Sequence, residues 1–260
     1  MVRILSAAVL IPVFFGGIWF LPSLWLLAVA EAVLLLAFVE YVRLAETLGA
    51  RVPRAASGAA AAAMCAAVGL GLPLELPLAA ALVGLGALVV GSRAPAPGVL
   101  ADVSAAVFPV IYLGLPLGSF VALHAMGGRE IVILLLLTIV VSDSAQYFTG
   151  RLVGRRTLSP AISPKKTLEG ALGGFVIAPA VMAVVARWWM PDRSTGWVLL
   201  VGLVLVGFGI AGDLFESLLK RSAGVKDSSA LIPGHGGVLD RIDAMLFAAP
   251  VFYVLLKYGG

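Results

Sequence analysis

The sequence has few charged residues and a single cysteine. Only 12% of its 260 residues are Asp, Glu, Lys or Arg, whereas 61% are hydrophobic. Soluble domains carry about 25% charged residues, so this composition predicts a polytopic, all-α integral membrane protein. The lone Cys65 excludes an intrachain disulfide and is expected to be a small packing residue. No basic stripe alternates with exposed aromatic residues, which argues against a nucleic-acid-binding protein.

Long apolar runs make up most of the chain. A membrane helix needs about 20 mostly apolar residues, and on that rule the sequence predicts about nine transmembrane helices. The third run is rich in alanine and glycine, so we expect it to pack closely against other helices. We divide the chain into residues 1–125, which are mainly apolar helices, and 126–260, which carry the polar loops. The predicted spans are 4–21, 24–41, 55–72, 74–91, 103–124, 130–149, 168–190, 196–219 and 242–258.

The lysines and arginines are distributed unevenly between alternate loops. Nine spans place the two termini on opposite sides of the membrane, and a cytoplasmic N-terminus puts fourteen of the eighteen basic residues on the cytoplasmic side. Cytoplasmic loops carry the excess of Lys and Arg in membrane proteins. We therefore expect a multi-pass protein of the cell (inner) membrane whose two polar loops, 150–167 and 220–241, both face the cytoplasm.

The first polar block starts inside the sixth span and continues into the next loop. Asp143 interrupts an otherwise apolar helix, where an isolated carboxylate is costly, so we expect it to have a metal ion or a cation as partner. The loop adds five cations, with hydroxyls and glycines, which suits a phosphate-rich ligand. Alternatively, these cations only anchor the loop at anionic headgroups. The candidate site residues are Asp143, Ser163, Lys165, Lys166, Thr167 and Glu169.

The second polar block runs from Gly212 to Asp243. Asp213 lies near the end of the eighth span, and Asp240 and Asp243 lie three residues apart at the start of the ninth. Side chains at this spacing share a helix face. Together with Asp143 these carboxylates predict a Mg²⁺ site, because Mg²⁺ prefers carboxylate and phosphate oxygens. The alternative for Asp240 is that it only caps the ninth helix.

The turn in this block is rich in glycine. Gly236 and Gly237 follow His235, and their backbone N–H groups are expected to contact phosphate. His235 lacks the His or Cys partners of a zinc site, so we expect it to form hydrogen bonds. Outside both blocks, Glu40 lies at the end of the second span close to Arg43. We expect the two to form an interfacial ion pair.

Familiar nucleophile motifs are missing from the sequence. It contains no Gly-x-Ser-x-Gly elbow and no Walker motif. A metal-assisted transfer between two bound ligands would need no protein nucleophile, since one ligand's phosphate oxygen can attack the other's phosphorus.

Two long motifs resemble a known family. One motif consists of the run Ser217-Leu-Leu-Lys-Arg221, four further residues, and the segment Lys226-Asp-Ser-Ser-Ala-Leu-Ile-Pro-Gly-His-Gly-Gly-Val-Leu-Asp-Arg-Ile-Asp243. It is similar to the signature of phosphatidate cytidylyltransferases, also called CDP-diacylglycerol synthases. Its part from Lys226 to Asp243 is here called the signature segment. The block from Ser142-Asp143 to Glu169-Gly170 resembles the family's other polar stretch. Together the motifs cover about a quarter of the chain, and the N-terminal half resembles the family only in hydropathy and length.

The resemblance implies a nucleotidyltransferase of phospholipid biosynthesis. It would transfer the cytidylyl group of CTP to phosphatidic acid, giving CDP-diacylglycerol and pyrophosphate. The resemblance also implies a Mg²⁺ requirement, with a monovalent cation such as K⁺ as a second ion, and a homodimer among membrane lipids. On this basis residues 1–125 would serve packing, dimerisation and lipid access, and residues 126–260 would form the catalytic region. Our hypothesis assigns the metal to Asp213, Asp240 and Asp243, with Asp143 as a further ligand. The cations expected to neutralise pyrophosphate and the lipid headgroup are Lys165, Lys166, Lys220, Arg221 and Arg241, with Lys226 and Glu169 in supporting roles.

Other functions remain open at this stage. A CTP-dependent polyprenol or dolichol kinase would yield CDP instead of pyrophosphate. CDP-alcohol phosphotransferases fit less well, because their Asp-Gly-x-x-Ala-Arg pattern is missing. A transporter would be expected to hold its carboxylates near the membrane midplane and to show inverted repeats, neither of which the sequence indicates.

Overall fold

The computed structural model describes residues 16–92, 96–232, 234 and 236–259. The predicted first span, 4–21, therefore lies mostly outside the described residues. His235 also lies outside them. The fold is built from helices and one small hairpin. The helices are α2 (Ser23–Thr47), α3 (Arg54–Gly69), α4 (Glu75–Ser92), α5 (Val99–Pro109), the π-helical turn η1 (Val110–Gly114), α6 (Leu115–Val153), α7 (Leu168–Trp189), α8 (Thr195–Ser222) and α9 (Leu239–Tyr258); the strands are β1 (Thr157–Ser159) and β2 (Ser163–Thr167).

The predicted all-α membrane protein is confirmed. Among the described residues, four helical segments are long and apolar enough to cross a membrane, and Glu75–Gly91 forms a shorter apolar helix. The four are Ser23–Thr47, Val99–Val153, Leu168–Trp189 and Thr195–Ser222. The total of nine spans stays a prediction, as does the division of the chain at residue 125.

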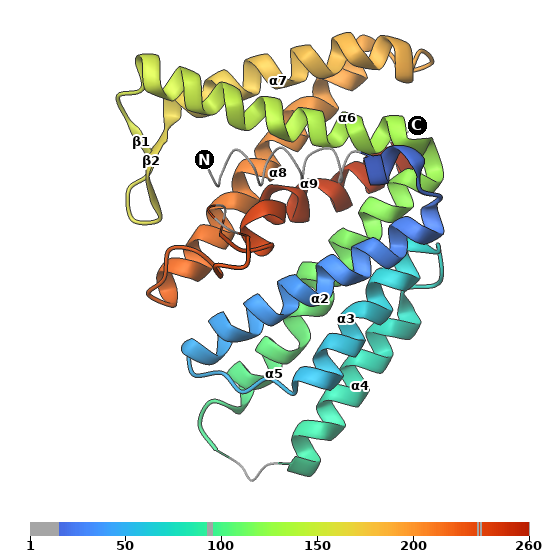
Figure 1. Cartoon of the computed structure of the whole chain (residues 1–260), viewed down its shortest axis with the longest axis vertical. Coiled ribbons are helices and arrows are strands. Elements are labelled where there is room, and N and C mark those ends of the chain that lie inside the picture. The colour runs from blue at the N-terminus through green and yellow to red at the C-terminus, as the bar shows by residue number, and fades with distance from the viewer. Residues whose placement is uncertain (1–15, 93–95, 233, 235, 260) are drawn as a thin grey trace.

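The long helical segment from α5 to α6 bends sharply at one glycine. Gly128 has φ 74° and ψ −173°, a backbone conformation that glycine adopts at little cost and other residues rarely adopt. In Figure 1 the chain rises through η1 and the first part of α6, then turns and runs back across the top of the molecule. The break falls between the spans predicted at 103–124 and 130–149, which confirms that separation.

Successive helices run back and forth between the same two ends of the molecule. At the left of Figure 1, the ends of α2, α6 and α8 lie near the starts of α7 and α9 and the β1–β2 hairpin. Both polar blocks therefore lie at one end of the helical bundle, as the sequence predicts. The side of the membrane that this end faces stays a prediction.

Small residues allow α3 to approach η1 and α6 closely. A Cβ added to Gly118 would lie 2.6 Å from the carbonyl oxygen of Cys65, and one added to Gly114 would collide with the backbone of Ala61. Cys65 is fully buried in this interface. The predicted packing role of the alanine-rich segment is thus confirmed, and Cys65 is one of its packing residues.

We expect Gly118→Ala to destabilise the protein, because the added methyl group has no space against α3. Overpacking of this kind costs about 1–3 kcal/mol. Gly84→Ala is the matched control, because a Cβ on that helical glycine meets no atom within 4 Å. Thermal unfolding in detergent should show a midpoint several degrees lower for Gly118→Ala and unchanged or higher for Gly84→Ala. Equal midpoints for the two variants would contradict this packing.

Candidate active site

Three carboxylates from three different helices form an acidic centre. Asp143 lies on α6, Asp213 on α8 and Asp243 in the first turns of α9. Each of the three interacts electrostatically with the other two. Residues thirty to one hundred positions apart in the sequence thus share one acidic centre, and three of the four predicted metal ligands are in it.

Lys166 connects the first polar block to this acidic centre. Its ammonium group forms an ion pair with Asp213 and also interacts electrostatically with Asp143. Lys166 lies on β2, which pairs antiparallel with β1 so that Thr157 faces Thr167 and Ser159 faces Ser163. The sequence predicts a loop at residues 150–167, but this segment contains a hairpin that carries Lys166 to α8.

The other candidates of the first block hold the hairpin against the helices. Thr167 caps α7, since its hydroxyl accepts a hydrogen bond of 3.0 Å from the Gly170 N–H. Glu169 accepts hydrogen bonds from the N–H groups of Arg155 (3.0 Å) and Arg156 (3.2 Å). Both side chains therefore fix the connection between α6 and α7.

Glycines bring α6 and α7 into close contact beside Asp143. A Cβ at Gly170 would lie 2.7 Å from the carbonyl oxygen of Gln146, and one at Gly174 would lie 2.9 Å from the Gln146 side chain. Gln146 in turn donates a hydrogen bond of 3.0 Å to Ser142 and a long one of 3.4 Å to Asp143. On the hairpin, Lys165 is exposed and Ser163 is half-buried.

Lys220 lies inside the protein between two carboxylates. Its ammonium group is 2.5 Å from Glu216, one helical turn earlier, and forms a second ion pair with Asp240 of α9. Glu216 is completely buried and Lys220 nearly so. A buried acid in a membrane protein requires a partner, and Lys220 neutralises two of them. The structure therefore places Lys220 in the packing between α8 and α9.

Asp240 uses its second oxygen to hold the signature segment. That oxygen accepts hydrogen bonds from the Ser228 N–H (2.9 Å), the Ser228 hydroxyl (2.8 Å) and the Gly237 N–H (2.7 Å). Both oxygens of Asp240 are therefore engaged in contacts within the protein. Its assignment as a metal ligand stays a prediction. The alternative, that Asp240 caps the ninth helix, does not describe these contacts, because Val238 is the N-cap of α9 and the helix has no side-chain cap.

Glu40 of α2 contacts the signature segment, and the sequence did not reveal this contact. The sequence predicts an interfacial pair with Arg43, but Glu40 is only 2% exposed and its carboxylate binds the signature segment. It accepts four hydrogen bonds, from Ser228, Ser229, Val238 and Leu239. The one available signal was a carboxylate at the end of an apolar helix, which does not identify a partner almost 200 residues away.

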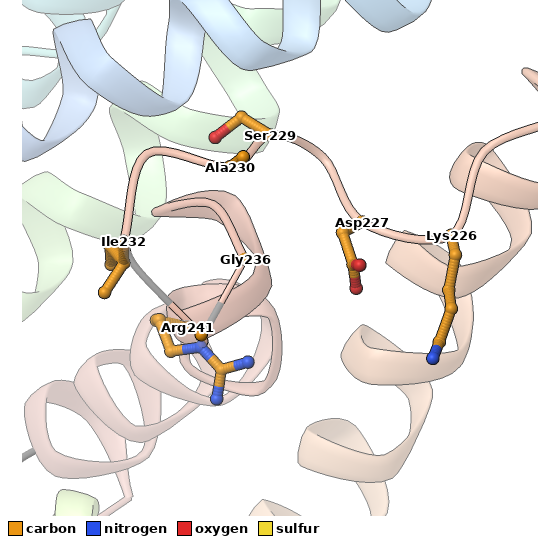
Figure 2. A pocket seen from close by; sticks show the side chains of 8 residues that line it. Lys226, Asp227, Ser229, Ala230, Ile232, Gly236 and Arg241 are labelled. Atoms are coloured by element: carbon orange, nitrogen blue, oxygen red, sulfur yellow. The ribbon is translucent and has the colours of Figure 1, made fainter. Parts of the chain in front are cut away.

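The signature segment lines a polar pocket of about 500 Å³. Lys226, Asp227, Ser229, Gly236 and Arg241 are among its lining residues. Figure 2 shows the side chains of Arg241 and Asp227 pointing into the space between the start of α9 and the end of α8, with Lys226 at its far side. The guanidinium of Arg221 donates a hydrogen bond of 3.2 Å to the Val225 carbonyl just before this segment.

The acidic centre contains the oxygen donors that a hard cation prefers. In the arrangement of the described residues, no group of three or more His, Cys, Asp or Glu side chains is close enough to hold a metal ion. The Lys166 ammonium group bonds to Asp213 in this arrangement. Mg²⁺ commonly keeps water and substrate phosphates as ligands beside one or two carboxylates, so the donor chemistry fits this ion.

Comparison with known proteins identifies relatives of this chain. It is 43% identical over 135 residues to the uncharacterised protein YnbB of Escherichia coli, covering 52% of this chain and 45% of that protein. It is 41% identical over 157 residues to a phosphatidate cytidylyltransferase of Helicobacter pylori, covering 60% and 58%. A protein of that name from Bacillus subtilis is 41% identical over 151 residues, covering 56% and 55%.

The chain matches roughly half the length of these relatives. A family model described as the cytidylyltransferase family, by contrast, matches residues 1–259, which is nearly the whole chain. On that match the chain belongs to the cytidylyltransferase family.

Proposed function

We propose that this protein transfers the cytidylyl group of CTP to phosphatidic acid, forming CDP-diacylglycerol and pyrophosphate. The observation that carries the proposal is the grouping of Asp143, Asp213 and Asp243, with Lys166 of the first polar block paired to Asp213. The family membership and the names of relatives such as the H. pylori and B. subtilis proteins support the choice of substrates.

In this mechanism one bond forms and one breaks. A phosphate oxygen of phosphatidic acid attacks the α-phosphorus of CTP, and the bond between that phosphorus and the oxygen bridging to the β-phosphate breaks. Pyrophosphate leaves with the electron pair of the broken bond. The protein's task is to align two anionic ligands and to offset their charge, since no covalent intermediate with the protein is needed.

The basic residues of the two blocks divide this task. Lys226 and Arg241 line the signature pocket and would bind phosphate oxygens there. Lys165 and Lys166 lie on the hairpin beside the acidic centre, and Lys166 can exchange Asp213 for a ligand phosphate. Lys220 lies inside the protein, so its role would be to keep Glu216 and Asp240 neutralised while the ligands bind.

Asp143, Asp213 and Asp243 would hold Mg²⁺ in this proposal. The bound ion would offset charge on the CTP phosphates as the leaving group departs. The three carboxylates repel one another, and among the ion pairs of the described residues Lys166 supplies the compensating charge. A monovalent cation beside Mg²⁺, a homodimer, and a cytoplasmic active site in the inner membrane complete the proposal.

The products distinguish this reaction from that of a CTP-dependent lipid kinase. We expect the purified protein in detergent to release pyrophosphate only when CTP, phosphatidic acid and Mg²⁺ are all present. Coupled detection of pyrophosphate, with chromatography of the nucleotide products, measures this. Formation of CDP with no pyrophosphate, with a polyprenol in place of phosphatidic acid, would favour the kinase.

Asp243→Asn should lower kcat about 100-fold, because it removes one charge from the proposed metal ligands without changing the side chain's shape. Asp192→Asn, in the exposed turn between α7 and α8, is the matched control and should keep the parent's rate. Titration with Mg²⁺ should show that Asp243→Asn also needs a higher concentration for half-maximal rate. Parent-like rates and Mg²⁺ dependence in Asp243→Asn would remove that residue from the metal site.

A further inference from the structure

One buried carboxylate of the N-terminal half holds the signature segment. On α2, Glu40 accepts hydrogen bonds from the hydroxyls of Ser229 (2.6 Å) and Ser228 (3.0 Å). It also accepts hydrogen bonds from the backbone N–H groups of Leu239 (2.8 Å) and Val238 (3.0 Å). Ser228 and Ser229 precede the glycine-rich turn of the signature segment, and Val238 and Leu239 follow it. A single side chain therefore joins the two sides of this turn.

The position of Glu40 suits a negative charge. The first N–H groups of a helix have no partner within the helix, and an anion there is favoured by the helix dipole. Residue 238 at the N-cap of α9 is valine, whose side chain has no acceptor, and no side-chain cap is present. The Glu40 carboxylate, which comes from another helix, takes the place of the missing cap.

The segment is shaped around this carboxylate. A Cβ added to Gly237 would lie 2.5 Å from each Glu40 oxygen and would collide with the Ser228 hydroxyl, so a residue larger than glycine would displace the contact. The Ser228 hydroxyl also lies 2.8 Å from Asp240. Glu40 and Asp240 therefore hold the same serine from two sides, one from α2 and one from α9.

The held residues are continuous with the polar pocket. Ser229, a donor to Glu40, lines the pocket. Gly236 and Arg241 also line it, and they lie just before and just after the backbone donors Val238 and Leu239 in the sequence. Glu40 itself is not among the pocket's lining residues. Any influence of Glu40 on a bound ligand therefore passes through the signature segment.

We propose that Glu40 is a positioning residue of the cytidylyl-transfer site, holding the signature segment so that Lys226 and Arg241 face one pocket. This inference rests on the proposed function and deepens it, because it gives the N-terminal half a direct part in building the nucleotide site. The hydrogen bonds to a charged carboxylate are of the stronger kind, so their loss should loosen the segment measurably.

The test compares Glu40→Gln with Glu46→Gln, a matched change six residues later on α2, where Glu46 forms an exposed ion pair with Arg54. Glutamine keeps one acceptor oxygen and turns an amide donor toward the N–H groups at the start of α9. We expect trypsin to cut Glu40→Gln after the exposed Lys226 about tenfold faster than the parent, and the KM for CTP to rise about tenfold with a smaller change in kcat. Glu40→Asp, which keeps the charge, should recover part of both losses.

Glu46→Gln should match the parent in both measurements. Parent-like cleavage and KM in Glu40→Gln would overturn the proposal. If Glu40→Gln does not fold, Ser229→Ala decides, because it removes one of the four hydrogen bonds; faster cleavage after Lys226 supports the proposal and unchanged cleavage overturns it. A parent protein without pyrophosphate release would refute the proposed function, whereas the cleavage rates would still decide whether Glu40 holds the segment.

Discussion

The cost of burying carboxylates among apolar helices governs the whole arrangement. An uncompensated charge at membrane depth is expensive, so each buried acid must have a cation or hydrogen-bond donors. Lys220 forms ion pairs with Glu216 and Asp240, and Lys166 forms one with Asp213. Glu40 accepts hydrogen bonds from the signature segment. These partners come from different helices, so compensating the acids also assembles the site.

Two kinds of carboxylate result from this arrangement. Glu40 and Asp240 have their oxygens saturated by donors of the signature segment and by Lys220, so they hold structure in place. Asp143, Asp213 and Asp243 repel one another, Lys166 pairs with Asp213, and we propose that these three carboxylates bind a divalent cation. The proposed chemistry uses the second kind, and its geometry depends on the first.

The sequence predicted the helices well, because long apolar runs leave little choice inside a membrane, and it placed both polar blocks at one end of the bundle. It also predicted that Asp143, Asp213, Asp240 and Asp243 lie together, and in the structure the first, second and fourth form the acidic centre while Asp240 pairs with Lys220. It did not predict the hairpin at 157–167, whose strands are too short to show a period, or the role of Glu40. Partners such as Glu40 and Leu239 are set by how α2 packs against α9, and spacing along the chain carries no information about that contact.

A double-mutant cycle tests directly whether the two polar blocks form one site through Lys166 and Asp213. The unfolding midpoint would be measured in detergent for the parent, Lys166→Gln, Asp213→Asn and the double variant. If the ion pair joins the blocks, the single changes should be non-additive, with a coupling of about 1 kcal/mol or more and a double variant little worse than the more severe single one. Strictly additive effects would contradict the account.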